Sequence, residues 1–319
     1  MVACLRRKQG RRYQSKVGDP AASPDAGSRG ALAPLAAGGP PLLTRRRTGP
    51  LLVTMVALTG LLVLNVLPLL WGVLTSFKQG ADILSYPPKI TFTPTLAHYA
   101  RVLQEGFGRN LLVSLADTLT AVLLTLLVAV PAAYAFDRAR FAFRRPLYLF
   151  VVACIPLALG ASALIIPAYV WFNRLGVNDT VAVLPLIYAG YQIPMAIWII
   201  KNAIEAVPTE LDEAATIDGC GHFGILWRIV LPLARPGIGA AAILAFVGAW
   251  NEFLAGSVMV DSAMLKPVQP AIYAFVGFFG REWGPLTAAA TLAILPIVVA
   301  FAMFGRLIIS GLTGGAVKG

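Results

Sequence analysis

Charged residues are scarce in this sequence. Only 13% of its 319 residues are Asp, Glu, Lys or Arg, 58% are apolar, and the mean hydropathy is +0.75. Soluble domains carry about 25% charged residues. The composition therefore excludes most soluble enzymes and binding modules, and it is typical of a chain that crosses a membrane several times.

Cysteine and histidine are also few. Cys4, Cys154 and Cys220 are far apart, and His98 and His222 are isolated. Neither residue type occurs at a spacing that binds metal, supports redox chemistry or builds a disulfide framework. A glycine-rich phosphate loop of the ATPase type is missing as well. We therefore expect no metal and no cofactor in this chain, and we expect that it does not hydrolyse ATP.

Positive charge is concentrated at the N-terminus. Residues 1–50 hold ten Lys or Arg against two Asp, which is +8 of the net +11. Residues 1–48 are rich in Arg, Gly, Pro, Ala and Ser without periodicity, which predicts a disordered tail. Arg45, Arg46 and Arg47 adjoin the first apolar run, where basic residues orient a span and attract anionic lipid. We expect contact with membrane lipid and none with nucleic acid.

Six long apolar runs follow the tail. A helix that rises 1.5 Å per residue crosses a hydrocarbon core of about 30 Å in about 20 residues. The sequence therefore predicts an all-α polytopic membrane protein, with a six-helix transmembrane domain over residues 49–319. The predicted spans are residues 51–77, 110–136, 146–172, 181–200, 237–260 and 285–310.

The charge of the short loops orients these spans. The tail and the turn after the second span are basic, whereas the loops after the third and fifth spans are not. Lys and Arg favour the cytoplasmic side, so both termini and the polar loop between spans four and five are predicted to be cytoplasmic. Residues 78–109 are then external, with a short helix near residues 96–103.

The most polar part of the second half is residues 208–236. Four acids fall within nine positions: Glu210, Asp212, Glu213 and Asp218. Pro208 suits a first helical turn, and Thr209 followed by Asp212 predicts a capping arrangement. Acids also favour a helix N-terminus.

Gly219 and Gly221 predict a turn after this helix, because glycine adopts the left-handed backbone that ends a helix. A second short helix is predicted over residues 222–230, ending before Pro232. On physics alone a solvated connector remains an alternative for this loop.

The order of residues in this loop resembles the EAA loop of ABC importer permeases. The matching positions are Leu211, Glu213, Ala214, Ala215, Asp218, Gly219, Phe223, Ile229, Leu231, Pro232 and Pro236. Cys220 departs from the usual alanine but is also small. The resemblance implies a coupling loop, about residues 202–236, that docks on a cytoplasmic ATPase made by another chain.

The residues of the motif suit docking. Ala214 and Ala215 leave a thin helix surface that fits a partner's groove. Glu213 and Asp218 can accept charge-assisted hydrogen bonds, and Gly219 permits close backbone approach. We expect these five residues to couple the chain to its ATPase.

Polar residues inside the predicted spans are candidates for a substrate pathway. Ser114, Asp117, Thr118 and Thr125 share one face of the second span. A carboxylate at the depth of Asp117 should face a partner or water rather than lipid. The alternative is a stripe that packs the helix bundle.

The later spans add four candidates. Asn251 and Glu252 lie in the segment Trp250-Asn251-Glu252-Phe253 of the fifth span, and they either contact sugar or brace the bundle. Tyr188 and Gln192 are four residues apart on one face of the fourth span.

Several segments narrow the resemblance to the carbohydrate-uptake branch of binding-protein-dependent permeases, the maltose "G" type. They are the WNEF segment, residues 71–78, residues 271–283 and the ending GLTGGAVKG at residues 311–319. The resemblance covers about residues 50–319 and implies a type I ABC importer in a bacterial inner membrane. It also implies a second permease, a dimeric ATPase that binds ATP and Mg, and an extracytoplasmic sugar-binding protein. The C-terminal tail would contact the ATPase, unless it is a frayed terminus.

Two other functions fit part of the sequence. An ABC permease for phosphate, amino acids or peptides would share the EAA loop, but it would not predict WNEF together with GLTGGAVKG. A stand-alone secondary transporter would predict inverted repeats or an ion-relay chain, and the sequence contains no convincing repeat.

Overall fold

The computed structural model describes residues 48–156, 162–277 and 280–313. The predicted tail, apart from its last residue, and residues 314–319 of the GLTGGAVKG ending lie outside this part of the chain. The chain divides into two units, Met1–Leu64 and Asn65–Gly319. The described part of the first unit is the beginning of helix α1 (Thr48–Ser76), which is apolar and carries Pro68 in its second half.

Long apolar helices dominate the described residues, and five of them are long enough to cross a membrane. Their apolar stretches are Val53–Ser76 of α1, Phe107–Arg138 (α4), Val183–Glu205 (α8), Arg235–Val258 (α12 and α13) and Trp283–Gly305 of α15. These stretches confirm the predicted spans one, two, four, five and six as helices. The remaining bounds are α12 (Arg235–Trp250), α13 (Leu254–Val258) and α15 (Trp283–Thr313).

The third predicted span differs from the expectation. In place of one helix over residues 146–172, the structure has α5 (Arg144–Ala153) and α7 (Ser162–Arg174), of 10 and 13 residues. Each is too short to cross a ~30 Å core at 1.5 Å per residue. The described chain turns at Cys154, and Pro156, which has no amide hydrogen to donate, disfavours a continuous helix there. The count of six spans therefore stays a prediction.

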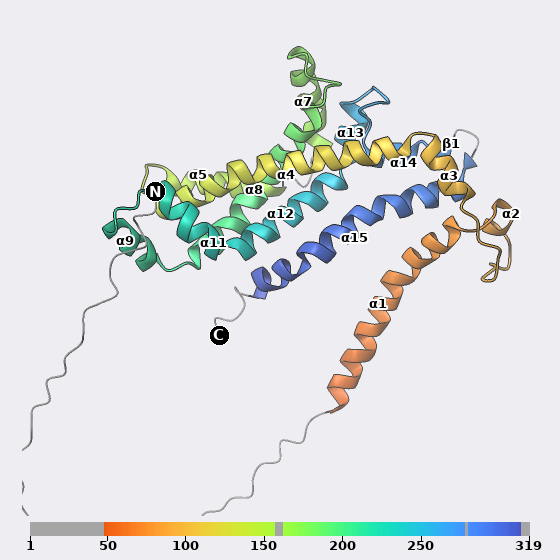
Figure 1. The fold of residues 1–319 in the computed structure, drawn as a ribbon, viewed down its shortest axis with the longest axis horizontal. Coiled ribbons are helices and arrows are strands. Elements are labelled where there is room, and N and C mark those ends of the chain that lie inside the picture. The colour runs from red at the N-terminus through yellow and green to blue at the C-terminus, as the bar shows by residue number, and fades with distance from the viewer. Residues whose placement is uncertain (1–47, 157–161, 278–279, 314–319) are drawn as a thin grey trace, which may run out of the picture. The chain divides into compact units, whose positions relative to one another are not determined.

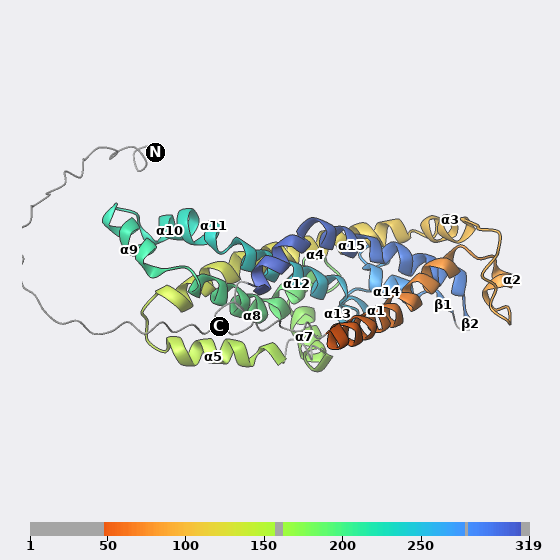
Figure 2. The same ribbon diagram turned by 90° about the horizontal axis from the view of Figure 1, so that it is seen from below.

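Helices α4, α8, α12 and α15 run side by side within the second unit (Figures 1 and 2). α4 and α8 make the most extensive contact, and α12 lies against α4, α8 and α15. Small residues such as Ala129, Ala133 and Ala196 fill the interface and are almost fully buried. Small side chains let helix backbones approach closely, which is how helices associate in lipid.

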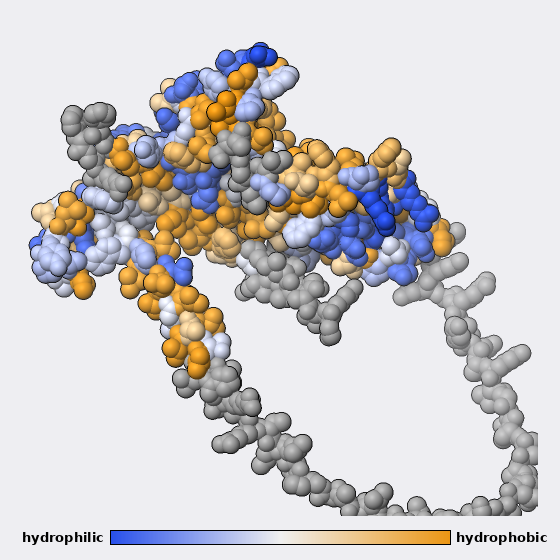
Figure 3. Space-filling view, turned by 180° about the vertical axis from the view of Figure 1, so that it is seen from behind, coloured by the Kyte–Doolittle hydropathy of each residue, from blue (hydrophilic) through white to orange (hydrophobic). Residues whose placement is uncertain are grey.

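The surface of this unit is apolar along its length. In Figure 3 hydrophobic residues cover the flank of the long helices, and hydrophilic residues gather toward the end that carries α9 (Thr209–Ile217). Large apolar side chains such as Leu112, Leu119, Leu123 and Leu127 project from one side of α4 and are more than half exposed. A lipid environment suits them, because exposing them to water would oppose folding.

Short elements close the end of the bundle opposite α9. They are α2 (Gly80–Ile83), α3 (Ala97–Gln104), α14 (Val268–Tyr273) and the strand pair β1 (Val276–Gly277) and β2 (Gly280–Arg281). α3 confirms the short helix predicted near residues 96–103. Arg101 on α3 pairs with Glu282 at 2.8 Å, just before α15 begins. This pair and the bond to Glu105 raise the pKa of the Arg101 guanidinium, with Glu105 the larger cause.

Gly237 shows how closely α12 and α8 approach. A methyl group added at this position would overlap the Cβ atom of Ala203 on α8. By contrast, a methyl group added at Gly190 of α8 would have no other atom within 4 Å.

We predict that Gly237→Ala lowers the stability of the protein by about 1–3 kcal/mol, because overpacking forces helices apart. Gly190→Ala is the matched control, and it should be neutral or stabilising by about 0.5 kcal/mol. Thermal unfolding in detergent measures both variants. Equal melting temperatures would show that α8 and α12 are not in contact at this point.

Candidate coupling loop and substrate pathway

The first helix of the polar loop ends as the sequence predicts. α9 is followed by Gly219, whose φ of +83° lies in the left-handed region that favours glycine. The amide of Cys220 donates to the carbonyl of Ala215 at 2.9 Å, and the amide of Gly219 donates to that of Thr216 at 3.0 Å. These two bonds form a Schellman motif, which closes the helix and fixes the turn.

The beginning of α9 differs from the prediction. No side-chain hydrogen bond caps the helix after Pro208. Asp212, expected to complete a capping arrangement with Thr209, instead directs its carboxylate to Arg138 at 2.7 Å. A guanidinium attracts a carboxylate more strongly than a neutral amide does, so the ion pair takes precedence over the cap.

The second helix of the loop is longer than predicted. α10 (His222–Ile225) continues through a π-helical turn, η1 (Leu226–Val230), into α11 (Leu231–Leu233), so Pro232 lies inside it. In a π turn the hydrogen bonds run to the fifth residue back rather than the fourth. This shift accommodates proline, which has no amide hydrogen to donate.

The five predicted coupling residues separate into two groups. Glu213, Ala214, Asp218 and Gly219 are exposed. Ala215 is 6% exposed and belongs to the same core cluster as Ile225 and Leu226. Ala214 is therefore accessible, whereas Ala215 packs inside the loop and is not part of its exposed surface. Docking of Ala214 on a partner stays a prediction.

Sequence reasoning missed an apolar patch on the same loop. Ile217, Phe223 and Trp227 are 87%, 74% and 55% exposed, and the two aromatic rings lie 5.9 Å apart. Exposed apolar groups surrounded by polar ones mark interaction surfaces. Phe223 matched the motif, but only the helix geometry places it beside Trp227.

Arg138, at the end of α4, holds the loop to the bundle. Its guanidinium contacts the carboxylates of Asp137 and Asp212 at 2.7 Å each, and it donates to the carbonyl of Val207 at 2.6 Å. Lys201 of α8 lies 3.6 Å from Asp137. This polar cluster joins α4, α8 and α9, and it was not predicted, because the Arg-rich turn was interpreted only as an orientation signal.

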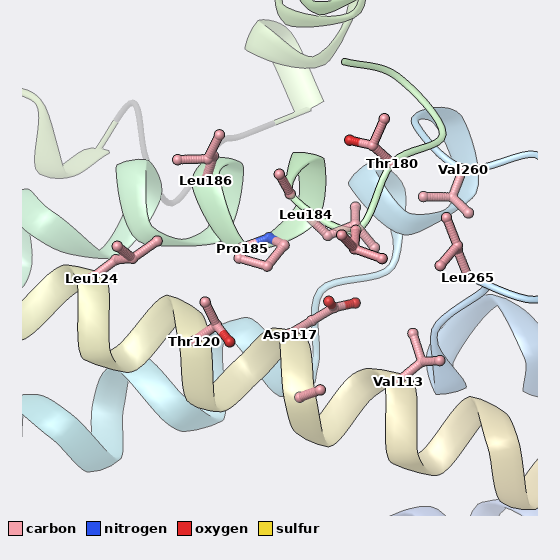
Figure 4. Close-up of a pocket in the computed structure, with 13 residues that line it drawn as sticks. Val113, Asp117, Thr120, Leu124, Thr180, Leu184, Pro185, Leu186, Val260 and Leu265 are labelled. Carbon is pink, nitrogen blue, oxygen red and sulfur yellow. The ribbon is translucent and has the colours of Figure 1, made fainter.

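Asp117 lines a cavity of about 500 Å³ in the α4–α8 interface. Figure 4 shows its carboxylate directed toward Leu184 and Thr180, with Val260 and Leu265 on the other side of the space. Thr120, one turn along α4, lines the same cavity. The carboxylate therefore lies against a cavity and is 9% exposed. That it faces a partner or water rather than lipid stays a prediction.

The rest of the polar stripe on α4 packs the bundle. Ser114 accepts a hydrogen bond from the amide of Val268 at 2.7 Å, which fastens the start of α14 to α4. Thr125 donates to the carbonyl of Ala121 within its own helix. The sequence left two alternatives for this stripe, a packing role in the helix bundle and a wall of the pathway. Ser114 and Thr125 have packing contacts, and Asp117 lines a cavity.

The WNEF segment forms a break between α12 and α13. Glu252 accepts a hydrogen bond from the amide of Ala255 at 2.8 Å and thereby caps α13. Asn251 is exposed and donates back to the carbonyl of Val247 at 2.9 Å. Trp250 is buried, and its indole donates to the carbonyl of Ala293 on α15. Bracing of a helix bend thus accounts for the local bonds of this segment.

Tyr188 and Gln192 differ in their surroundings. Tyr188 is 2% exposed and belongs to a buried cluster that includes Ala121 of α4 and Ala249 of α12. Its hydroxyl finds no hydrogen-bond partner among the described residues. Gln192 instead packs on Gly248 of α12, where any larger residue would collide with it. The structure thus buries Tyr188 in α8 and leaves Asn251 at the surface, and only Asp117 of these candidates lines the cavity.

In residues 48–156, 162–277 and 280–313, no group of three or more His, Cys, Asp or Glu residues is arranged to hold a metal ion. Long apolar helices, a largely apolar cavity lined also by Asp117, Thr120 and Thr180, and a protruding helical loop are typical of a membrane component of a transport system.

The chain belongs to the family of binding-protein-dependent transport system inner membrane components, which it matches over residues 95–313. It is 31% identical over 268 residues to the sulfoquinovosyl glycerol transport system permease protein SmoH of Agrobacterium fabrum, covering 83% of this chain and 93% of that one. It is 31% identical over 261 residues to the trehalose/maltose transport system permease protein MalG of Thermococcus litoralis, covering 79% and 91%. The predicted family and inner-membrane location are confirmed, and the chain is the membrane subunit of a transporter rather than its ATPase.

A solved structure has the same fold. A chain in the crystal structure of a bacterial ABC transporter involved in the import of the acidic polysaccharide alginate matches with a TM-score of 0.71. The match covers 84% of this chain and 100% of that one, at 20% identity. This likeness confirms the predicted fold class of an importer permease.

We predict that Glu252→Ala lowers stability by about 1 kcal/mol, because it removes the acceptor that caps α13. Glu252→Gln keeps a side-chain oxygen at the same position and should lose less. Thermal unfolding of the two variants in detergent compares them. If the two melting temperatures fall equally, the carboxylate does not act through this hydrogen bond.

Proposed function

We propose that this chain is a permease subunit of an ATP-driven ABC importer for sugars, and that it forms half of the translocation pathway together with a second permease. The observation that supports it best is the loop at residues 208–233. It is a closed helical unit with exposed acids and an exposed apolar patch, on a chain that belongs to a binding-protein-dependent transport family.

Two observations favour sugars as the substrate class. The names of the relatives SmoH and MalG refer to transport of a sugar glycoside and of disaccharides. Asp117 and Thr120 in the cavity are hydrogen-bonding groups that suit hydroxylated ligands. Permeases for phosphate, amino acids or peptides remain the alternative, and the wall described here has no basic group to hold phosphate.

The loop would act as a mechanical link. A dimeric cytoplasmic ATPase that binds ATP and Mg closes and opens, and the loop follows as a rigid body. The pathway then alternates between states open to the outside and to the cytoplasm. An extracytoplasmic binding protein would deliver sugar to the outward-open state. This proposal requires both termini and the loop to be cytoplasmic.

We predict that Glu213→Lys and Gly219→Asp each uncouple ATP hydrolysis from uptake without preventing membrane insertion. The first reverses an exposed charge, and the second strains a left-handed turn by about 1–2 kcal/mol and adds a charge to the docking surface. Proteoliposomes with the complete transporter would measure ATP hydrolysis and uptake, using a sugar selected by titrating the purified binding protein.

Matched controls distinguish the loop from general damage. Asp261→Lys reverses an exposed charge between α13 and α14, and Gly176→Asp alters another left-handed glycine, with φ of +68°. Both controls should transport as wild type does. Normal coupling in Glu213→Lys and Gly219→Asp would remove the loop from the mechanism.

We also predict that Asp117→Asn lowers the kcat/KM of uptake about ten- to a hundredfold, because it removes one charged hydrogen bond of roughly 1.5–3 kcal/mol. The substitution keeps the size of the side chain, so melting temperature should change little. Uptake kinetics in the same proteoliposomes test it. Unchanged kcat/KM would assign the cavity to helix packing rather than to the pathway.

A further inference from the structure

The segment between α8 and α9 is the point at which the loop could pivot. α8 ends at Glu205, and the backbone becomes extended at Pro208, with ψ of 132°, before α9 begins. Val207 lies between them and is buried. If nothing fixed this short connection, a force applied to α9 would bend it and would not reach the transmembrane helices.

Arg138 spans this pivot from the neighbouring helix. Its Nη2 atom donates to the carbonyl of Val207 at 2.6 Å, within the pivot, and to that of Ile204 at 3.5 Å, in the last turn of α8. Its Nε atom contacts Asp212 at 2.7 Å, on the α9 side. Its Nη1 atom contacts Asp137 at 2.7 Å, on its own helix. One planar group on α4 therefore contacts the end of α8, the connection and α9 at once, through hydrogen bonds to the carbonyls of Ile204 and Val207 and an ion pair with Asp212. The contact with Asp212 is a close ion pair rather than a well-aligned hydrogen bond.

The polar cluster around Arg138 is largely buried, so breaking its contacts costs more free energy than breaking contacts at the surface. The side chains of Arg138, Asp212 and Asp137 are 14%, 16% and 9% exposed. Ion pairs at the surface contribute little to stability, but breaking a buried one leaves an uncompensated charge. A guanidinium also offers five donors in a fixed plane, so lysine cannot replace all of these bonds.

We propose that Arg138 is the positioning residue of coupling: it locks the α8–α9 pivot so that the loop moves as one body with α4 and α8. This inference rests on the proposed coupling function but adds a residue outside the loop. Without the lock, α9 would still dock on the ATPase, and its movement would be absorbed by the segment 206–208.

The test uses the complete transporter in proteoliposomes, with its second permease, ATPase and binding protein. The readout is the ratio of ATP hydrolysis with and without purified binding protein. Arg138→Gln and Asp212→Asn should each lower this ratio about fivefold, an effect within the range seen for single substitutions that weaken coupling between sites. Basal ATP hydrolysis, without binding protein, should persist. Arg138→Lys should lose less than Arg138→Gln, since it keeps a positive charge beside Asp212.

A double-mutant cycle separates this role from general destabilisation. Both substitutions break the same link, so Arg138→Gln with Asp212→Asn should lower the ratio no further than either alone. Independent damage would instead multiply the two losses. Amide hydrogen exchange should become about fivefold faster in residues 209–217 of Arg138→Gln and stay unchanged in residues 121–133.

Arg144→Gln is the matched control, because Arg144 donates to the carbonyls of Asp137 and Ala139 within its own turn. It should keep the wild-type ratio.

If Arg138→Gln and Asp212→Asn also keep the wild-type ratio, the lock is refuted and the proposed coupling function stands. If the wild-type chain neither binds an ATPase nor responds to binding protein, the proposed function itself fails. If the Arg138→Gln chain does not assemble into the complete transporter, the ratio measured for Asp212→Asn tests the proposal by itself.

Discussion

Every backbone amide and carbonyl inside a membrane needs a hydrogen-bond partner, since lipid supplies none. Long helices satisfy most of these groups internally, and the polar side chains of this protein satisfy others where helices break. Glu252 accepts from an amide at the start of α13, and Ser114 accepts from the first amide of α14. Arg138 donates to a carbonyl just beyond the end of α8.

This constraint explains why polar residues inside the spans have two kinds of role. A side chain beside a helix break is occupied by the backbone, as Glu252 and Ser114 are. Asp117, on the same helix as Ser114, makes no such bond to a helix break and lines a cavity instead. Polarity alone therefore does not separate bracing residues from candidates for the pathway; the contacts of each side chain do.

The sequence predicted what depends on local pattern. Apolar length located five helices among the described residues, and Gly219 marked a turn whose Schellman bonds the structure contains. The predictions that differed depend on tertiary contacts. Asp212 left the expected cap because Arg138, 74 residues earlier in the chain, offers a stronger partner. Ala215 is buried because the second helix of the loop folds over it, which spacing alone does not reveal.

The two functional regions are connected through one helix. Asp117 and Arg138 both lie on α4, 21 residues apart, which is about 32 Å along the helix axis. If a displacement of α9 moves Arg138, it moves α4, and α4 is also the helix that places Asp117 in the cavity wall. Pro131 lies between them and removes one intrahelical hydrogen bond, so α4 can bend there. Transmission along α4 accordingly depends on the packing of Ala129 and Ala133 against α8, which holds the helix in place on both sides of the proline.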